Sequence, residues 1–454
     1  MDFQWYGSPR ATKALSMINP AAVLLAFSLF CGGTVAFAEP MHTPTKMPMA
    51  KAESVGMSTE GLKHIDEIMQ EYIDAGTIQG GITVVARRGK VVHFSTHGDM
   101  DVKKGRAMEA DAIFRMASST KAVTGVAAMM MIQEGLISPS DPVSKYIPEF
   151  ADMKVAIPVS NADSKAKTKN KAKAKGKDTG ATPAHRLVPV DTPVTIHHLL
   201  THTAGLRSGG LGTKVDQVEP ATGDQTLATY IPRLAKVPLD FQPGTQRRYS
   251  PTTGLDVVAR IIEIVSETPF DEFLQARIFN PLGMNSAYFR VPDDMKSKVV
   301  VVADTGASGK KNKKKKIVAG PLRYVSASAG LSSTAEDYLH FQQMLLNYGE
   351  LFGHQVLSPM AVKMMSSNQV GDIDLTSDPK SRKGLGHGYT VGVTLDSKLA
   401  ANYRGNGAFG GGGAFGTMSW TDPENELVAI IMLQQPRGGM QTAFAKAIQQ
   451  AIVN

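Results

Sequence analysis

Strand patterns at both ends of the chain, separated by a long helical middle, constrain its fold more than any other feature of the sequence. Near the N-terminus, residues 82–87 and 91–95 are rich in β-branched side chains and flank a short turn, which indicates a β-hairpin. Near the C-terminus, residues 417–420 and 427–433 form a second strand pair around a turn. We expect both pairs to share one antiparallel sheet.

Amphipathic helix patterns lie outside these strands at each end of the chain. One follows Ser58 and has Ile65 on its apolar face, and another closes the chain with Phe444 and Ile448. We expect these first and last helices to cover the sheet, which gives an α+β fold with three α/β/α layers. The middle, about residues 118–320, predicts an all-helical lobe. Its helix patterns lie near residues 195–203, 225–236, 252–266 and 270–278.

The first 38 residues have the three-part pattern of a secretory signal peptide. A weakly basic stretch with Arg10 and Lys13 precedes an apolar run over residues 21–30, and the small-residue site Ala36-Phe37-Ala38 follows. The apolar run is shorter than the roughly 20 residues of a membrane span. This favours cleavage over the alternative, an uncleaved membrane anchor.

Cleavage near Ala38–Glu39 would leave residues 39–454 as one exported domain, periplasmic or secreted. The single cysteine, Cys31, would leave with the signal segment. We therefore expect a mature protein with no disulfide, no cysteine nucleophile and no thiolate metal site.

The excess positive charge, +8 for the whole chain, is concentrated in two lysine-rich tracts. Residues 161–180 and residues 304–316 each carry a net charge of +5, and the mature chain outside them sums to −3. Neither tract has large apolar side chains to bury, so we expect solvated, disordered insertions. No aromatic side chains are interleaved for base stacking, so we expect no nucleic acid as a partner. The alternative is a weak contact of the tracts with an anionic cell envelope.

A Ser-x-x-Lys sequence, Ser118 to Lys121, opens the helix pattern over residues 117–134. Positions i and i+3 share a helix face, so the hydroxyl and the amine can meet. The helix N-terminus adds unpaired backbone N–H groups and the positive end of the helix dipole. A serine in that setting can be activated by an amine whose pKa is lowered by burial, although a capping serine followed by a surface lysine gives the same pattern.

Two later segments supply further candidate site residues. Tyr249 follows Gln242-Pro243-Gly244 and is expected in a loop, where a packed tyrosine is the plain alternative to a functional one. Residues 409–417 read Phe-Gly-Gly-Gly-Gly-Ala-Phe-Gly-Thr, and glycines that enter an edge strand let the backbone approach a ligand closely. A flexible hairpin is the alternative there, and no Gly-Lys-Ser/Thr follows to make a phosphate loop.

In this order and spacing, the three segments resemble the serine β-lactamase and penicillin-binding protein superfamily. The similarity is closest to its class C-like branch, which includes the family VIII carboxylesterases. Residues 196–206, with Leu-Leu-Thr-His-Thr-Ala-Gly-Leu, and residues 327–334, with Gly-Leu-Ser-Ser-Thr, resemble further segments of that branch. The resemblance covers residues 55 to 435 and implies a β-lactamase/transpeptidase-like fold.

The resemblance also implies roles for individual residues. Ser118 would accept the acyl group, Lys121 would share in its proton transfer, and Tyr249 would be the general base and later activate the deacylating water. The backbone N–H groups of Ser118 and Ala414 would form the oxyanion hole, where each donor typically contributes ~10²–10³ in rate. To act as a base, Tyr249 needs a pKa below its ordinary ~10, and a neighbouring ammonium is the expected cause. The substrate would lie along Gly411, Gly412 and Gly413.

Two departures separate the chain from the β-lactamases of this superfamily. Pro251 stands at the Asn position of their Tyr-x-Asn, and we expect that it can bond neither a substrate amide nor the lysine. The glycines at 411–413 stand where those enzymes carry Lys-Thr-Gly or His-x-Gly, so the cation for a substrate carboxylate is missing. Both favour an exported serine hydrolase of carboxylic esters. The alternatives are a β-lactamase or DD-peptidase-like enzyme, and a non-catalytic relative that binds cell-wall ligands.

We expect no cofactor and no metal. His198 and His202 are four residues apart on an expected helix, but no His-Glu-x-x-His pattern is present, and the resemblance makes His202 a structural hydrogen-bonding residue. The expected partner is a small-molecule ester or amide substrate. The acyl group, the alcohol and the oligomeric state are left open by the sequence.

Overall fold

The computed structural model describes residues 46–453, apart from residues 160–182, 223, 302–322, 372, 374–382 and 436–437. The predicted signal segment (1–38) and both lysine-rich tracts (161–180 and 304–316) therefore lie outside the described residues. No helix within the described ranges combines the length and the apolar character that a bilayer span requires.

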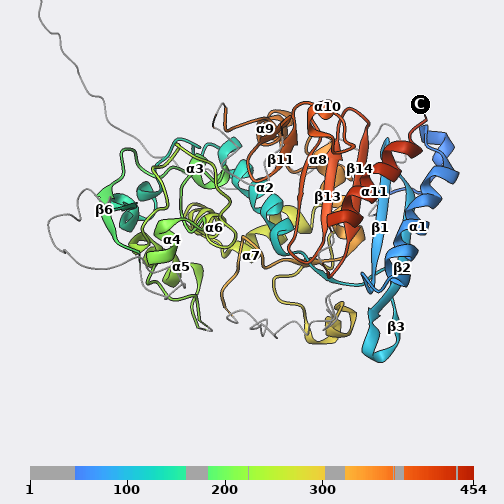
Figure 1. The fold of residues 1–454 in the computed structure, drawn as a ribbon, viewed down its shortest axis with the longest axis horizontal. Helices are drawn as coiled ribbons and strands as arrows, with labels where there is room; N and C mark the ends of the chain where they lie inside the picture. The colour runs from blue at the N-terminus through green and yellow to red at the C-terminus, as the bar shows by residue number, and fades with distance from the viewer. Residues whose placement is uncertain are drawn as a thin grey trace, which may run out of the picture. The chain divides into compact units, whose positions relative to one another are not determined.

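An eight-stranded antiparallel sheet forms the centre of the described chain (Figure 1). Its last strand in sequence, β14 (Leu427–Met432), pairs with its first, β1 (Gly80–Arg87), so the two ends of the chain share one sheet as predicted. β1 also pairs with β2 (Lys90–Asp101), and β14 with β13 (Met418–Asp422). The remaining strands of the order β10-β11-β12-β13-β14-β1-β2-β3 are β3 (Arg106–Ala107), β10 (Leu385–His387), β11 (Gly392–Thr394) and β12 (Phe409–Gly412).

Helices cover both faces of this sheet: α1 (Thr59–Asp74) with α11 (Gly438–Ala451) on one face, and α8 (Ala335–Leu346) on the other, where it packs against β13, β14 and β1. The helix α2 (Thr120–Gln133) packs against α6 (Gly254–Ser266) and α9 (Pro359–Met365). α1 and α11 lie side by side, and the side chains beneath them form a hydrophobic core of their own (Figure 1). Successive side chains of a strand point to opposite faces. Val85 accordingly belongs to the core under α1 and α11, and Val84 to the larger core that contains α2 and α8. These are the predicted α/β/α layers.

Between α2 and α8 the chain builds a second lobe, seen away from the sheet in Figure 1. The predicted helices are present there, in shorter form. They are α3 (Ile196–Leu200), α5 (Leu227–Tyr230), α6 (Gly254–Ser266) and α7 (Phe270–Leu274), with α4 (Leu211–Val215) in addition.

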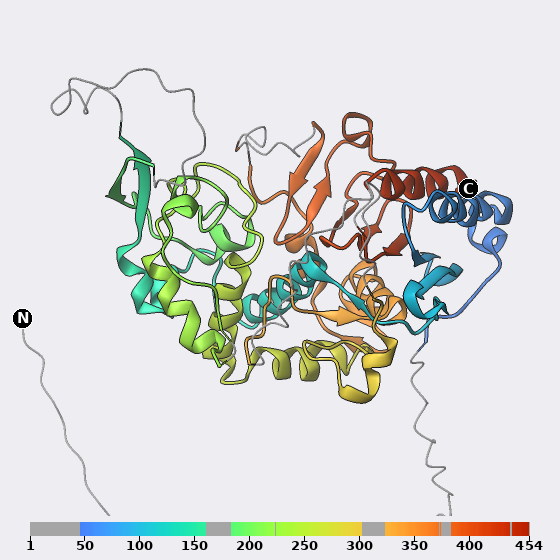
Figure 2. The same ribbon diagram turned by 60° about the horizontal axis from the view of Figure 1, so that its bottom comes forward.

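The structure corrects one part of the lobe prediction. β5 (Lys154–Pro158) and β6 (His185–Pro189) pair as an antiparallel hairpin, so the lobe is not entirely helical (Figure 2). Both strands end at a proline, and the lysine-rich tract rather than a tight turn separates them in the sequence. Neither the strand signal nor the hairpin signal was therefore visible in the sequence.

A short strand pair connects the two halves of the chain next to the candidate site. β4 (Phe114–Arg115) pairs with β7 (Ser332–Ser333), which places the segment before Ser118 beside the segment before α8. The remaining α-helices and strands of the described residues are β8 (Glu350–Leu351), β9 (His354–Gln355), α9 (Pro359–Met365) and α10 (Ser397–Ala400).

Candidate active site

Ser118 lies in the tight turn that leads into α2. The 3₁₀-helix Ala117–Ser119 follows β4 and continues directly into α2. Ala117 has a φ of 45°, which is uncommon for a residue with a Cβ. Such conformations persist where the surrounding structure holds them and are frequent at functional sites. Ser118 is half-buried, whereas both of its neighbours are buried, so the turn presents the serine at the surface of the fold.

Lys121 lies one helical turn after Ser118 and is only 3% exposed. Its Nζ donates hydrogen bonds to Ser118 Oγ at 3.2 Å, to the Pro251 carbonyl at 2.8 Å and to the Ser328 carbonyl at 2.7 Å. We expected Pro251 to be unable to bond the lysine, and that expectation was wrong, because the backbone carbonyl of a proline remains an acceptor. Burial lowers the pKa of Lys121 to about 8, although the charge of Asp256 acts in the opposite direction.

Asp256 of α6 is a buried carboxylate that faces the same backbone segment as Lys121. Its Oδ1 accepts the Ser328 N–H at 2.8 Å and its Oδ2 accepts the Tyr324 hydroxyl at 2.7 Å. Burial is the main influence on this carboxyl and raises its pKa to about 6. Sequence reasoning missed Asp256, since the only signal was one acid in the first turn of an apolar helix. Ser328 therefore bonds the carboxylate through its N–H and the lysine through its carbonyl.

Tyr249 completes the contacts of the serine hydroxyl. Its hydroxyl donates to Ser118 Oγ at 2.7 Å, and Lys121 Nζ lies 5.0 Å from the centre of its ring. Tyr249 is 37% exposed, so solvent reaches part of the residue. Desolvation of the hydroxyl raises the pKa of Tyr249, against smaller opposing effects of Ser118 and Arg247. The expectation of a lowered pKa was therefore wrong, because desolvation of Tyr249 outweighs the effects that lower it.

A buried histidine, His202, packs against the tyrosine ring. The His202 ring centre lies 4.8 Å from that of Tyr249, and its Nδ1 accepts the Ser250 N–H at 3.4 Å. Burial lowers the pKa of His202 well below its ordinary value, so the ring is neutral and can accept this bond. His198 is engaged elsewhere, since its Nδ1 accepts the Thr195 N–H at 3.2 Å.

The glycine-rich end of β12 packs against the backbone before Ser118. A Cβ added to Gly413 would lie 2.2 Å from the Met116 carbonyl oxygen, so this approach requires glycine. The Thr417 hydroxyl donates to the same carbonyl at 3.2 Å and lies 3.0 Å from Ser119 Oγ. These contacts fix the end of β12 and the loop after it to the turn that carries Ser118.

The open side of β12 and the loop after it face solvent. A Cβ added to Gly411 would meet nothing within 4 Å, and Gly412 and Ala414 are exposed. Among the residues that the structure describes, the backbone N–H groups of Ser118 and Ala414 donate no hydrogen bond. Unpaired N–H groups beside a nucleophile are what an oxyanion hole requires.

Comparisons with known proteins agree over most of the chain. The model of the family described as Beta-lactamase matches residues 65–452. Protein Rv1367c of Mycobacterium tuberculosis is 30% identical over 387 residues, which cover 81% of this chain and 88% of the relative. Esterase EstB of Burkholderia gladioli is 26% identical, with 86% of this chain and 94% of EstB covered.

A solved structure extends the likeness to the fold. EstCE1, described as a hydrolase with promiscuous acyltransferase activity, is similar with a TM-score of 0.67 at 24% sequence identity. The match covers 87% of this chain and 98% of EstCE1. The sheet, the flanking helices and the second lobe thus form an architecture that is already known.

Proposed function

Because this chain belongs to the beta-lactamase family, we propose that it cleaves carboxylic esters through an acyl-enzyme formed on Ser118. Family membership and the esterase relative support a serine hydrolase of this superfamily as the general class. The observation that carries the ester proposal is the position of Ser118 Oγ, which bonds both Lys121 Nζ at 3.2 Å and the Tyr249 hydroxyl at 2.7 Å. A hydroxyl held by an amine and a phenol has two groups that can exchange its proton.

In the first half of the proposed reaction, Ser118 Oγ forms a bond to the ester carbonyl carbon. The neutral amine of Lys121 takes the serine proton, and its pKa of about 8 keeps a fraction of the amine neutral at pH 7. The developing oxyanion accepts the N–H groups of Ser118 and Ala414. The C–O bond to the alcohol then breaks, and the Tyr249 hydroxyl protonates the leaving oxygen while Lys121 returns a proton to the tyrosine.

In the second half, water attacks the acyl-enzyme from the open side of the site. Lys121 and Tyr249 now accept the water proton and return it to Ser118 Oγ, so the free serine and a carboxylic acid are formed. A neutral Tyr249 suits this relay, since its raised pKa keeps the proton on the hydroxyl between the two steps. In this scheme Lys121 is the base and Tyr249 passes protons.

The surroundings of the serine favour uncharged esters over β-lactams. β12 consists of Phe409 and three glycines, so this strand supplies no cation for a substrate carboxylate. The Pro251 carbonyl is occupied by Lys121, and its ring offers no amide for a substrate. The exposed Gly411 and Gly412 leave room for the acyl or alcohol group beside the strand.

The test is hydrolysis of short p-nitrophenyl esters and of a chromogenic cephalosporin by the purified protein. We expect ester turnover and slow or absent cephalosporin turnover. Ser118→Ala should lower kcat/KM for the ester roughly 10³-fold or more, because the nucleophile is lost. Ser140→Ala changes an exposed serine on a surface turn and is the matched control.

An activated phosphonate supplies a second readout that does not depend on the choice of ester. We expect one adduct on the peptide that contains Ser118, detected by mass spectrometry, and none in Ser118→Ala. Turnover retained by Ser118→Ala would show that the nucleophile is another residue. A higher kcat/KM for the cephalosporin than for every ester would replace the esterase proposal by the β-lactamase alternative.

A further inference from the structure

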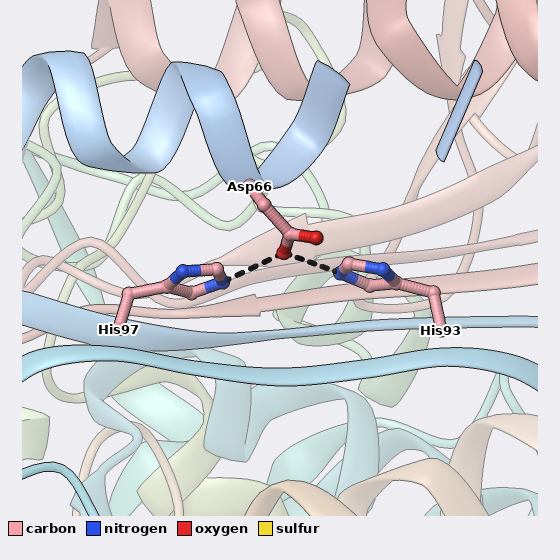
Figure 3. Close-up of side chains that lie close together, drawn as sticks. All are labelled: Asp66, His93 and His97. Atoms are coloured by element: carbon pink, nitrogen blue, oxygen red, sulfur yellow. Dashed lines mark ion pairs between the residues drawn. The ribbon is translucent and has the colours of Figure 1, made fainter. Parts of the chain in front are cut away.

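A second polar cluster lies on the face of the sheet that α1 covers, away from the face that packs on α8. It consists of Asp66 on α1 and of His93 and His97 on β2 (Figure 3). Four residues apart on a strand, the two histidines point to the same face. Thr83 of β1 lies in the same layer as Val85, which belongs to the core under α1. The cluster is therefore separated from Ser118 by the sheet itself.

The two imidazole rings and the carboxylate converge on a small volume. The Nε2 atoms of His93 and His97 lie 3.8 and 3.6 Å from Asp66 Oδ1, and the three candidate ligand atoms all fall within 4.8 Å of one another. Figure 3 shows Asp66 reaching down from the helix and the ring edges of both histidines directed at the same oxygen. Ligand atoms around a tetrahedral ion with bonds of about 2.0–2.1 Å are separated by about 3.3 Å, so a small closing movement suffices.

Hydrogen bonds within the protein leave this cluster incomplete. Separations of 3.6 and 3.8 Å are too long for hydrogen bonds, and Asp66 Oδ1 is buried with no hydrogen-bond partner among the residues that the structure describes. The Thr83 hydroxyl contacts His93 Nε2 at 2.8 Å and His97 Nε2 at 3.1 Å, but it has only one proton to donate. A buried carboxylate oxygen without a partner is costly, and a cation bound at this point would remove that cost.

The protonation of the rings also suits a cation. Burial lowers the pKa of His93 to about 4 and also lowers the pKa of His97, although the Asp66 charge opposes both changes. Both imidazoles are therefore neutral at pH 7, as ligands must be. The Asp66 side chain is 46% exposed, so an ion can reach the cluster from solvent beside α1.

We propose that Asp66, His93 and His97 form a binding site for one divalent transition-metal ion of the zinc class. Two imidazoles and one carboxylate are a donor set that suits zinc, whereas calcium and magnesium prefer oxygen ligands only. The Thr83 hydroxyl or a water takes the fourth position. An ion bound there joins α1 to β2, so the site stabilises the layer over this face of the sheet and takes no part in ester cleavage.

The test is calorimetric titration of Zn²⁺ into the full chain, purified without a polyhistidine tag and first treated with a chelator. We expect one ion per chain. His93→Gln and His97→Gln should each weaken Zn²⁺ binding at least 10-fold. Mutation of residues that only hydrogen-bond to a metal ligand already weakens binding by about that factor. The matched control is His64→Gln, because His64 is an exposed histidine on α1 whose Nδ1 contacts Glu67 at 2.5 Å.

If a histidine variant fails to fold, metal binding can still be tested with Asp66→Asn. The Asp66 side chain is half-exposed, so this change should leave the fold intact. Co²⁺ bound to the wild type should show the intense visible bands of a four-coordinate site, and Asp66→Asn should lose them. Zn²⁺ should raise the melting temperature of the wild type and of His64→Gln, and not that of the cluster variants. Absence of stoichiometric binding, or equal binding by the wild type and the cluster variants, would overturn the proposal.

Discussion

The two faces of the central sheet carry polar clusters that are built in opposite ways. Around Ser118, the charged Lys121 is bonded by two backbone carbonyls and the serine, and the nearby Asp256 has partners on both oxygens. Under α1, Asp66 Oδ1 has no hydrogen-bond partner in the described part of the chain, although two neutral imidazoles lie beside it. The charged groups of the first cluster are bonded by neighbouring protein atoms, and the buried carboxylate oxygen of the second is not.

The two kinds of construction suit different tasks. A catalytic amine must stay in place while its proton moves, and backbone acceptors hold it there because they do not titrate. A metal site instead leaves lone pairs unmatched until the ion arrives. Single variants in each cluster can test whether the two clusters are as independent in function as they are in construction.

The largest effect is expected from Lys121→Met, which removes the amine and keeps the apolar stem. We expect kcat/KM for a p-nitrophenyl ester to fall roughly 10²–10⁴-fold, because the proton of Ser118 loses its acceptor. His93→Gln, on the other face, should leave kcat/KM within about twofold of the wild type. Circular dichroism of both variants checks that the fold is kept.

Comparable losses of kcat/KM in Lys121→Met and His93→Gln would contradict the independence of the two clusters. They would mean that the cluster under α1 acts on the active site through the sheet. Near wild-type activity in Lys121→Met would instead identify Tyr249 as the base and reverse the roles assigned above.

A smaller effect is expected from a change at Gly413, directly after β12, where the chain borders the turn that carries Ser118. Gly413→Ala places a Cβ 2.2 Å from the Met116 carbonyl, and overpacking of this kind costs about 1–3 kcal/mol. We expect a lower urea midpoint and a roughly 10-fold lower kcat/KM, since the strand moves away from the serine turn. Gly411→Ala is the matched control for the urea midpoint, because its Cβ would meet nothing within 4 Å. Equal urea midpoints for the two variants would show that this approach does not fix the site.

The fold and the first cluster were largely accessible from the sequence. The hairpin over 82–95, the strands near 418–432 and the terminal helices have strong local periodicity, and their pairing across the sheet followed from the layers they must form. Ser118, Lys121 and Tyr249 lie in short segments whose order resembles the family, and the structure brings their side chains together. The hairpin β5–β6 was missed because its connection carries no turn signal.

The rest depends on packing that no local pattern records. Asp256 resembles any acid near a helix N-terminus until the fold places it beside Ser328. The Pro251 carbonyl meets Lys121 because of the backbone path, which the side chain does not reveal. His93 and His97 share a strand face, and their spacing in the sequence was a usable signal. The third residue, Asp66, comes from α1, and the packing of the core under α1 sets how that helix is rotated over the strand.

The smallest effect is expected on the pH dependence of kcat/KM, when the carboxylate near each cluster is neutralised: Asp256 near Lys121, and Asp66 under α1. The kcat/KM of the wild type should rise with pH through about 8 as Lys121 loses its proton. The negative charge of Asp256 raises the pKa of that lysine, so Asp256→Asn should move the rising limb to lower pH. Asp66→Asn, the same change on the other face, should leave the limb in place. If the rising limb of the pH profile keeps its position in Asp256→Asn, Lys121 is not the titrating base. If the rising limb moves in Asp66→Asn, the sheet does not isolate the two clusters.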